Sequence, residues 1–363
     1  MKHPTKWITW SSIGTFACMT AVLVITPAST VAQGSSKQAN SDTGPQKVIL
    51  DTDFVVPPQD DGMALILALK SRELQILGVT TVAGNDTMQR ATSDALRVLE
   101  IAERTDIPVY RGANRPLVHE KTDWGTTVHG KWWSDEPPPT PPGGFAKKQA
   151  EKESAVDFII RTIEANPNQV TIIAIGPLTN IATAIRQEPG LAQKVKKIAI
   201  MGGAIGSLPD GGGNVTPNAE FNFWVDPEAA HVVLRSGITI SLTPLNVTRK
   251  THFSKQYYDQ IVAADTPVTR LIKERMGPGF AANPDRRGAM HDQLTVGSVI
   301  DPTLMKSKDL YVDVDINYGP DYGVSVGAEK PWEGGEGATK ISVQYDVDFD
   351  RFISMFVERV ASR

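Results

Sequence analysis

Four carboxylates lie close together in the segment 51–61, at Asp51, Asp53, Asp60 and Asp61. Carboxylates at this density repel one another unless a positive charge lies among them. A hard divalent cation would supply that charge, and Ca²⁺ typically takes about six to eight oxygen ligands from carboxylates, carbonyls and water. The alternative is that the acids cap a following helix, but capping accounts for only one or two of them. The segment therefore predicts a metal site.

More polar residues follow at positions where a sheet would bring them toward these acids. Asn85 follows an apolar run, and a glycine-rich segment carries Asn214, Glu220 and Asn222. In open α/β sheets, ligands bind outside the carboxyl ends of the strands. The acids and the amides are therefore expected to form one site.

The hydropathy pattern predicts the elements that must position this site. Continuous apolar runs indicate buried strands at 47–51, 74–82, 107–110, 170–175, 197–201 and 238–242, with late strands at 310–318 and 341–345. Amphipathic spacing indicates helices at 61–70, 88–104, 155–165, 178–186, 227–235 and 349–360. Buried strands that alternate with helices are typical of an α/β fold, a mostly parallel sheet with helices on both faces. The proline-rich stretch 135–144 is predicted to be a surface loop near the site, with a domain linker as the alternative.

The composition excludes several classes of protein. Hydrophobic residues make up 40% and charged residues 21% of the 363 residues, as in soluble globular proteins. The net charge of −4 argues against nucleic acid as a partner. Because Cys18 is the only cysteine, an internal disulfide or a multi-thiolate metal site is excluded.

An ordered series of motifs resembles the inosine-uridine-preferring nucleoside hydrolase family. They include Val48-Ile-Leu-Asp-Thr-Asp53, Asp60-Asp61-Gly-Met-Ala-Leu65, Thr80-Thr-Val-Ala-Gly-Asn85, Gly176-Pro-Leu-Thr-Asn-Ile-Ala182 and Met290-His-Asp292. The most specific run is Met201-Gly-Gly203, followed by Ala219-Glu-Phe-Asn222 and Asp226-Pro-Glu-Ala-Ala-His231. The resemblance covers about residues 47 to 360. It implies a single domain over 47–363 with a Rossmann-like nucleoside hydrolase fold.

The resemblance also implies a role for each matching residue. Asp53, Asp61, Asp292 and the backbone carbonyl of Ile175 would bind Ca²⁺, together with the ribose diol and a water. Asp60 would accept a proton from that water, and His291 would help to protonate the leaving base. Ribose hydroxyls would be held by Asn85, Asn214, Glu220 and Asn222, with Asp51 supporting the loop and the ribose.

The implied reaction is hydrolysis of the N-glycosidic bond of a ribonucleoside. Its transition state resembles an oxocarbenium ion, which surrounding carboxylate and amide oxygens stabilise. Attack by water from the face opposite the base would invert the anomeric carbon. Two alternatives stay open: a non-catalytic exported nucleoside- or sugar-binding protein on the same fold, and a haloacid-dehalogenase-like phosphatase, since Asp51-Thr-Asp-Phe-Val55 also fits the strand end of that class.

The chain departs from the family pattern at two points. Six residues, 54–59, separate Asp53 from Asp60 where the family usually has three, and Gln293 stands where proline commonly follows His-Asp. The longer segment contains two prolines, which would stiffen it.

Several aromatic and histidine residues have both a functional and a structural interpretation. Trp132 and Trp133 could stack on the nucleobase or pack within their loop. Trp224 lies in a strand-like run after Asn222 and is expected in the core. His119, His231 and His252 are expected to be structural or surface residues.

The N-terminal segment is predicted to be a targeting signal. Residues 1–32 combine two lysines, an apolar stretch and a small-residue site ending at Ala32, as in a secretory signal peptide. Cleavage there would leave a polar, flexible leader at 33–46, with export to the periplasm or medium and no stable membrane insertion. We leave a homodimer or a homotetramer open.

Overall fold

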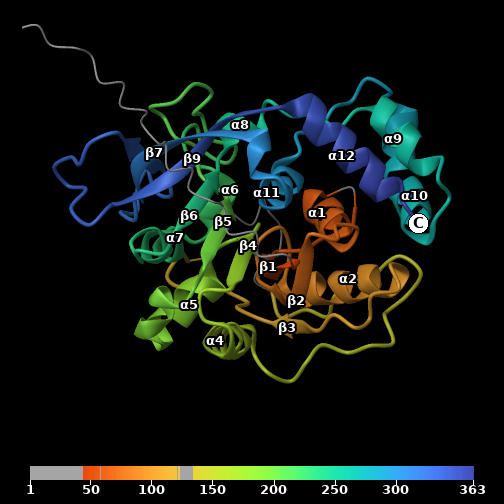
Figure 1. Cartoon of the computed structure of the whole chain (residues 1–363), viewed down its shortest axis with the longest axis horizontal. Coiled ribbons are helices and arrows are strands. Elements are labelled where there is room, and N and C mark those ends of the chain that lie inside the picture. Colours follow the sequence, from red (N-terminus) through yellow and green to blue (C-terminus); the bar gives the residue numbers. More distant parts are fainter. Residues whose placement is uncertain (1–43, 58, 121, 123–133) are drawn as a thin grey trace, which may run out of the picture. The chain divides into compact units, whose positions relative to one another are not determined.

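The computed structural model contains one large sheet that accounts for all the predicted strands (Figure 1). The structure describes residues 44–57, 59–120, 122 and 134–363. The predicted signal peptide, nearly all of the predicted leader, and Trp132 and Trp133 lie outside the described residues. Residues 44–363 form one compact unit. Its first strand begins at Gln46, the last residue of the predicted leader.

Nine strands in the described part of the chain pair side by side. In spatial order they are β3 (Val109–Arg111), β2 (Leu74–Thr81), β1 (Gln46–Thr52), β4 (Val170–Ala174), β5 (Lys197–Met201), β6 (Ile240–Thr243), β9 (Thr339–Val347), β7 (Met305–Val314) and β8 (Ser325–Ala328). The strands from β3 to β9 pair in parallel. Only β7 runs antiparallel to its two neighbours. The prediction of an α/β fold with a mostly parallel sheet is therefore confirmed.

Helices cover both faces of this sheet. They are α1 (Asp60–Leu69), α2 (Met88–Ile101), α4 (Ala155–Ala165), α5 (Thr179–Gln187), α6 (Phe221–Val225), α7 (Pro227–Leu234), α8 (Leu245–Thr248), α9 (Lys255–Val262), α10 (Pro267–Ala282), α11 (His291–Ile300) and α12 (Phe349–Ala361), with two short 3₁₀ turns at Pro189–Gln193 and Pro302–Leu304. None of these helices is long and apolar enough to cross a membrane.

The two cores follow from the alternation of side chains along a strand. In β1, Val48 and Leu50 face the core that contains α1, α2, α11 and α12, whereas Ile49 faces the core that contains α4, α5 and α7. All three side chains are at most 1% exposed. A strand with helices on both sides must be apolar on both faces, which is why these strands appear in the sequence as continuous apolar runs.

Three parts of the fold differ from the predictions. The run around Trp224 is the helix α6, because Glu220 caps it by accepting hydrogen bonds from the amides of Asn222 and Phe223; Trp224 is buried, as predicted. Helices α8, α9, α10 and α11 were not among the predicted elements, and α10 contains Gly277, Pro278 and Gly279, which are poor helix formers. The first late strand ends at Val314 rather than at Tyr318, and β8 was not predicted.

Candidate active site

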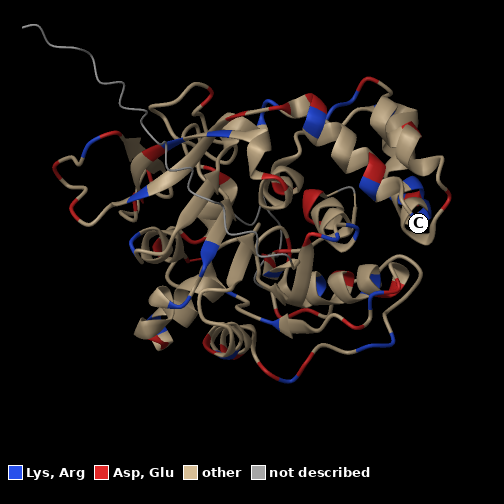
Figure 2. Cartoon of the chain, viewed as in Figure 1, with Lys and Arg blue, Asp and Glu red and all other residues tan. Residues whose placement is uncertain are grey.

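The site lies where the N-terminal ends of two helices meet. Helix α1 begins at Asp60 and helix α11 begins at His291, and the two helices pack against each other. Figure 2 shows acidic segments at the starts of both helices. Since a helix N-terminus carries a partial positive charge, it favours carboxylates in the first turn. The packing therefore joins Asp60 and Asp61 to Asp292, from the opposite end of the sequence.

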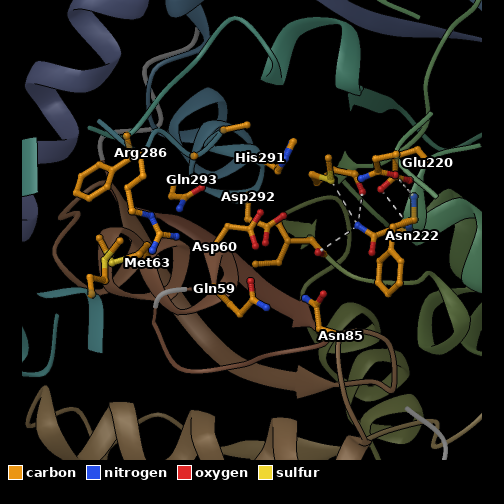
Figure 3. A pocket seen from close by; sticks show the side chains of 18 of the residues that line it. Gln59, Asp60, Met63, Asn85, Glu220, Asn222, Arg286, His291, Asp292 and Gln293 are labelled. Atoms are coloured by element: carbon orange, nitrogen blue, oxygen red, sulfur yellow. Dashed lines mark hydrogen bonds between the residues drawn. The ribbon is translucent and has the colours of Figure 1, made fainter. Parts of the chain in front are cut away.

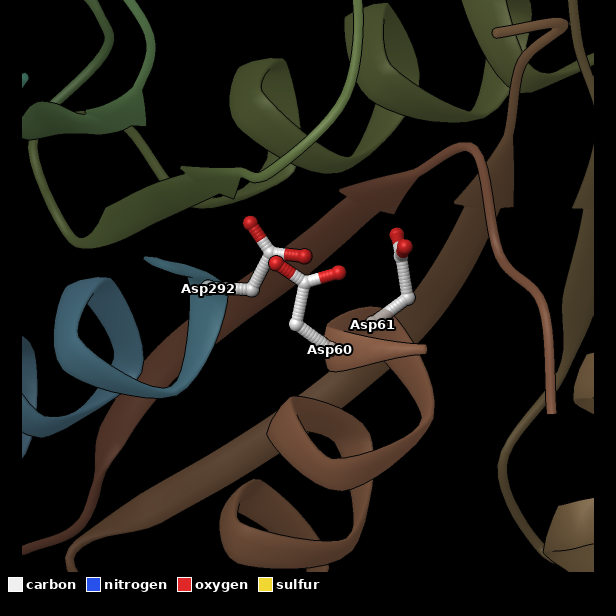
Figure 4. Close-up of side chains that lie close together, drawn as sticks. All are labelled: Asp60, Asp61 and Asp292. Atoms are coloured by element: carbon white, nitrogen blue, oxygen red, sulfur yellow. The ribbon is translucent and has the colours of Figure 1, made fainter. Parts of the chain in front are cut away.

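These three carboxylates face the same space (Figure 4). Asp60, Asp61 and Asp292 each offer one oxygen, and the three oxygens lie within 4.8 Å of one another. Asp61 and Asp292 are buried, whereas Asp60 is partly exposed. Oxygen atoms at this spacing could coordinate one cation.

Asp53 is connected to this group through Asn85. Its Oδ2 accepts a hydrogen bond from the backbone amide of Asn85 at 2.6 Å, while the side-chain amide of Asn85 donates to Oδ2 of Asp61 at 2.7 Å. The hydroxyl of Thr52 donates to the other oxygen of Asp61 at 2.6 Å. Oδ1 of Asp53 is buried and has no hydrogen-bond partner. A Cβ atom at Gly176 would lie 2.8 Å from that oxygen, so this close approach requires glycine.

Burial and mutual repulsion disfavour the ionised forms of these acids. Burial raises the pKa of Asp53 to about 7, and it also raises the pKa values of Asp61 and Asp292 well above the usual range. The neighbouring carboxylates add to the shifts, because the negative charges of Asp60 and Asp61 raise the pKa of Asp292 further. A bound cation would reverse these effects, because it stabilises the ionised form. The atoms that could coordinate an ion here are all oxygens, which fits a hard divalent cation.

Asp51 has a different environment from the other acids. It is fully buried and does not line the cavity described below, and burial raises its pKa to about 6. One carboxylate oxygen accepts hydrogen bonds from Thr80 at 2.5 Å and from Asn180 at 2.8 Å. Asn180 in turn accepts from the backbone amide of Ala113 at 2.8 Å. Asp51 therefore ties together the ends of β1 and β2, helix α5 and the loop after β3.

A cavity of about 350 Å³ opens beside the acid cluster (Figure 3). Asp60 and Asp292 lie in the middle of the view, with Glu220 and Asn222 on one side and Met63 and Arg286 on the other. Its lining residues are Gln59, Asp60, Met63, Asn85, Ile175, Met201, Asn214, Glu220, Phe221, Asn222, Phe253, Met276, Phe280, Arg286, Gly288, Ala289, His291, Asp292 and Gln293. The predicted site residues Asp60, Asn85, Ile175, Asn214, Glu220, Asn222, His291 and Asp292 all belong to this set. Asp53 and Asp61 lie behind the wall, in contact with Asn85.

The polar side of the cavity is held by hydrogen bonds to the backbone. Glu220 accepts from the amides of Asn222, Gly203 and Phe223 at 2.9–3.1 Å, and burial raises its pKa. The side-chain amide of Asn222 donates to the carbonyl of Met201 at 3.2 Å and to that of Ile175 at 3.4 Å. These bonds hold the side chains in position before a substrate arrives.

His291 lies on the cavity wall with one ring nitrogen already engaged. Its Nδ1 lies 2.7 Å from the hydroxyl of Thr248, which leaves Nε2 as the nitrogen available to the cavity. Burial lowers its pKa, so the neutral imidazole is favoured at pH 7. A hydroxyl that donates to Nδ1 would place the ring proton on Nε2.

Several residues at the site were not predicted. Thr52, Thr80 and Asn180 orient the carboxylates, and Thr248 orients His291. The threonines at the ends of β1 and β2 belong to the motifs already singled out, so their position was an available signal. The apolar wall of Phe253, Met276 and Phe280 comes from the segment without predicted elements.

Comparison with known proteins gives one consistent family. Residues 48–354 match the family model described as inosine-uridine preferring nucleoside hydrolase. The pyrimidine-specific ribonucleoside hydrolase RihB of Escherichia coli is 34% identical over 308 residues, which cover 84% of this chain and 94% of that protein. A plant nucleoside hydrolase structure, PpNRh1, matches with a TM-score of 0.74 and 30% identity, over 88% of this chain and 100% of that one. A purine-preferring ribonucleoside hydrolase from Gardnerella vaginalis matches with a TM-score of 0.72 and 28% identity, over 87% and 98% of the two chains.

Proposed function

The chain belongs to the inosine-uridine preferring nucleoside hydrolase family, and we propose that it hydrolyses the N-glycosidic bond of ribonucleosides with the help of a bound Ca²⁺. The observation that carries this proposal is the cluster of carboxylates at the cavity, in which one oxygen each of Asp60, Asp61 and Asp292 lie within 4.8 Å of one another. Family membership makes the chain a ribonucleoside hydrolase, and we propose the calcium ion and the mechanism in addition.

The proposed ligands of the ion are Asp53, Asp61, Asp292 and the carbonyl of Ile175. The unpartnered oxygen of Asp53 supports this assignment, since a buried carboxylate oxygen without a donor is costly. When bound, the ion would orient the ribose 2′ and 3′ hydroxyls and promote the ionisation of water.

Asp60 is proposed as the general base. It lines the cavity, and it is more exposed than Asp61 and Asp292, so a water molecule can reach it. Proton transfer from the attacking water to Asp60 would make the water nucleophilic as the glycosidic bond breaks. Asn214, Glu220 and Asn222 would hold the ribose and stabilise its developing positive charge.

His291 is proposed to assist the leaving base. A purine or pyrimidine anion leaves poorly, and a hydrogen bond from the Nε2–H of the neutral ring would stabilise the negative charge that develops on the leaving base. Attack from the opposite face would invert the anomeric carbon without a covalent intermediate.

The test is a chromatographic assay of the purified protein with inosine, adenosine, guanosine, uridine and cytidine, each beside its 5′-monophosphate. Free base and ribose from the unphosphorylated nucleosides are expected, with activity lost on chelation and restored by Ca²⁺. Full activity in metal-free protein would overturn the calcium assignment. Nucleoside binding without base release would instead indicate a binding protein, and phosphate release from the monophosphates would indicate a phosphatase.

We also propose that the protein is exported, because residues 1–32 have the pattern of a signal peptide. N-terminal sequencing of the protein after expression with its full leader should find a chain that begins at Gln33. A chain that retains residues 1–32 in the cytosolic fraction would contradict export.

A further inference from the structure

Asn214 reaches the cavity from a long segment without secondary structure of its own. Residues 202–220 connect β5 to α6 and contain neither helix nor strand. Asn214 is exposed on this segment and lines the cavity. Its Oδ1 accepts a hydrogen bond from the backbone amide of Phe221 at 2.9 Å. This bond orients the side chain, but the segment itself needs support from elsewhere in the fold to remain at the cavity.

That support comes from Arg249, at the C-terminal end of α8. Its Nη1 donates to the carbonyl of Asp210 at 3.0 Å and to that of Gly212 at 2.6 Å. Its Nη2 donates to the carbonyl of Gly213, the residue before Asn214, at 2.7 Å. Hydrogen bonds from a charged donor are roughly twice as strong as neutral ones. The rigid plane of the guanidinium also fixes the three carbonyls relative to one another.

The turn that Arg249 holds is closely packed. The amide of Gly213 donates to the carbonyl of Pro217 at 2.8 Å, and the amide of Asn214 donates to that of Ala219 at 3.1 Å. A Cβ atom at Gly213 would overlap the carbonyl oxygen of Ala219, so this close approach requires glycine. Because these bonds make the turn one unit, a shift at Gly213 would carry Asn214 with it.

The helix that carries this arginine is a firm support for the turn. All four residues of α8 are buried, and the helix packs against α11. The side chain of Asn246 accepts from the amide of Ile205 at 2.9 Å and donates to the carbonyl of Pro209 at 2.7 Å. Thr248, on the same helix, lies 2.7 Å from Nδ1 of His291. One short helix therefore contacts both the segment that carries a ribose-binding residue and the histidine on the cavity wall.

We propose that Arg249 is a positioning residue for the ribose site. It fixes the carbonyls of residues 210–213 on α8, so that Asn214 is held at the cavity before a nucleoside binds. Arg249 does not itself line the cavity, and it therefore acts through Asn214 rather than on the substrate. The inference rests on the proposed function, in which Asn214 binds the ribose, and extends it to a residue outside the cavity.

The experiment is a double-mutant cycle that measures kcat and KM for uridine. Its variants are Arg249→Met, which removes every donor, Asn214→Ala, and the two combined. Arg249→Lys keeps the charge but loses the planar fork. Lys250→Met is the control, because Lys250 is the next residue, is exposed, does not line the cavity and pairs with Asp346 at 3.2 Å. Thermal melting verifies that each variant is folded.

The expected effect is on KM. Without Arg249 the turn occupies its binding-competent position for only a fraction of the time, so Arg249→Met should raise KM about tenfold and change kcat by less than about threefold. In the Asn214→Ala background the same substitution should raise KM by less than about twofold, because the contact that it positions is already absent. Arg249→Lys should fall between, and Lys250→Met should match the wild type.

Equal rises of KM in both backgrounds would mean that Arg249 acts independently of Asn214 and would overturn the proposal. A lower melting temperature with an unchanged KM would also overturn it, because Arg249 would then contribute to stability alone. If Arg249→Met does not fold, Arg249→Lys completes the cycle, with the same inequality between backgrounds expected. If the wild type releases no base, the proposed function fails. The Kd values of uridine, measured by calorimetry on the same proteins, would then decide the inference alone.

Discussion

Buried carboxylates in two regions of this molecule differ in whether the chain supplies cationic partners for them. Asp313, on β7 in the antiparallel part of the sheet, is 7% exposed. It accepts hydrogen bonds from Nε of Arg235 at 3.0 Å, from Nδ1 of His231 at 2.8 Å and from its neighbouring backbone amide. At the carboxyl ends of the parallel strands, Asp53, Asp61 and Asp292 are buried as deeply, and no arginine, lysine or histidine of the described chain forms an ion pair with them.

The difference distinguishes a structural charge from a functional one. A buried carboxylate is costly unless it is paired, and α7 supplies the partners for Asp313 from within the chain. The site acids receive only neutral donors, namely Thr52 and Asn85. A cation from outside can therefore bind there without displacing a side chain, and four predictions test this contrast.

The largest effect is expected on catalysis, from Asp60→Asn. Loss of the general base should lower kcat by about 10²- to 10⁴-fold, while Ca²⁺ binding measured by calorimetry stays within about tenfold of the wild type. Asp309→Asn, on the exposed part of β7, serves as the control and should keep full activity. Retained hydrolysis would remove Asp60 as the base. Loss of calcium binding together with activity would make Asp60 a ligand instead.

The next effect is on stability, from Asp313→Ala. Removing one member of a buried ion pair leaves Arg235 and His231 without their partner, so unfolding by denaturant should require about 3 kcal/mol less. Nucleoside hydrolysis below the melting temperature should be unchanged. A stability equal to that of the wild type would mean that water satisfies Arg235 and His231 as well as the carboxylate does. Asp313 would then not differ from the site acids in being stabilised by its partners.

Asp292→Asn should act in the opposite direction. In metal-free protein it removes one of several mutually repelling carboxylates, so the free energy of unfolding should rise by about 1 kcal/mol. The same change should abolish the stabilisation by Ca²⁺, which for the wild type is about 2.7 kcal/mol at a hundredfold excess over Kd. Melting curves with and without Ca²⁺ measure both effects. A variant that is less stable without metal, yet still stabilised by Ca²⁺, would contradict the assignment.

The smallest effect is expected from Arg275→Met. Nε of Arg275, on α10, donates to the carbonyl of Pro57 at 3.1 Å, and Asp94 accepts from the amide of Val56 at 3.3 Å. These contacts hold the longer segment that precedes Asp60. Loosening it should lower kcat about threefold to tenfold, without changing the ratio of uridine to cytidine turnover. Lys273→Met, also exposed on α10, is the matched control. A changed ratio of uridine to cytidine turnover in Arg275→Met would show that Arg275 affects the choice of nucleobase rather than the segment before Asp60.

Much of the parallel half of the fold could be predicted from local pattern. Strands that are buried on both faces appear as short apolar runs, and β1, β2, β4 and β5 all lie within about two residues of their predicted bounds. The acids at 51–61 were recognisable because their number exceeds what helix capping needs. In the structure α1 has Gln59 as its N-cap, without a side-chain hydrogen bond, so capping by an acid does not occur there.

The apolar wall of the cavity, formed by Phe253, Met276 and Phe280, could not be predicted in the same way. Helix α10 contains two glycines and an internal proline, and it is stabilised by packing of Met276 and Phe280 in the core rather than by intrinsic helix preference. Thr248 reaches His291 only because α8 and α11 pack together. Contacts between elements far apart in the chain leave no local signature.

The sequence by itself determined which side chains of this protein can offer oxygen ligands. It also showed that residues 51–61 carry four carboxylates, which is more than the capping of one helix needs. The tertiary structure decided which of those oxygens share a space. It brought Asp292 to Asp60 and Asp61 and placed Asp51 in a separate hydrogen-bond network. The physical reason is that side-chain type is a local property, whereas distance between helix ends is set by the packing of α1 on α11 across the core.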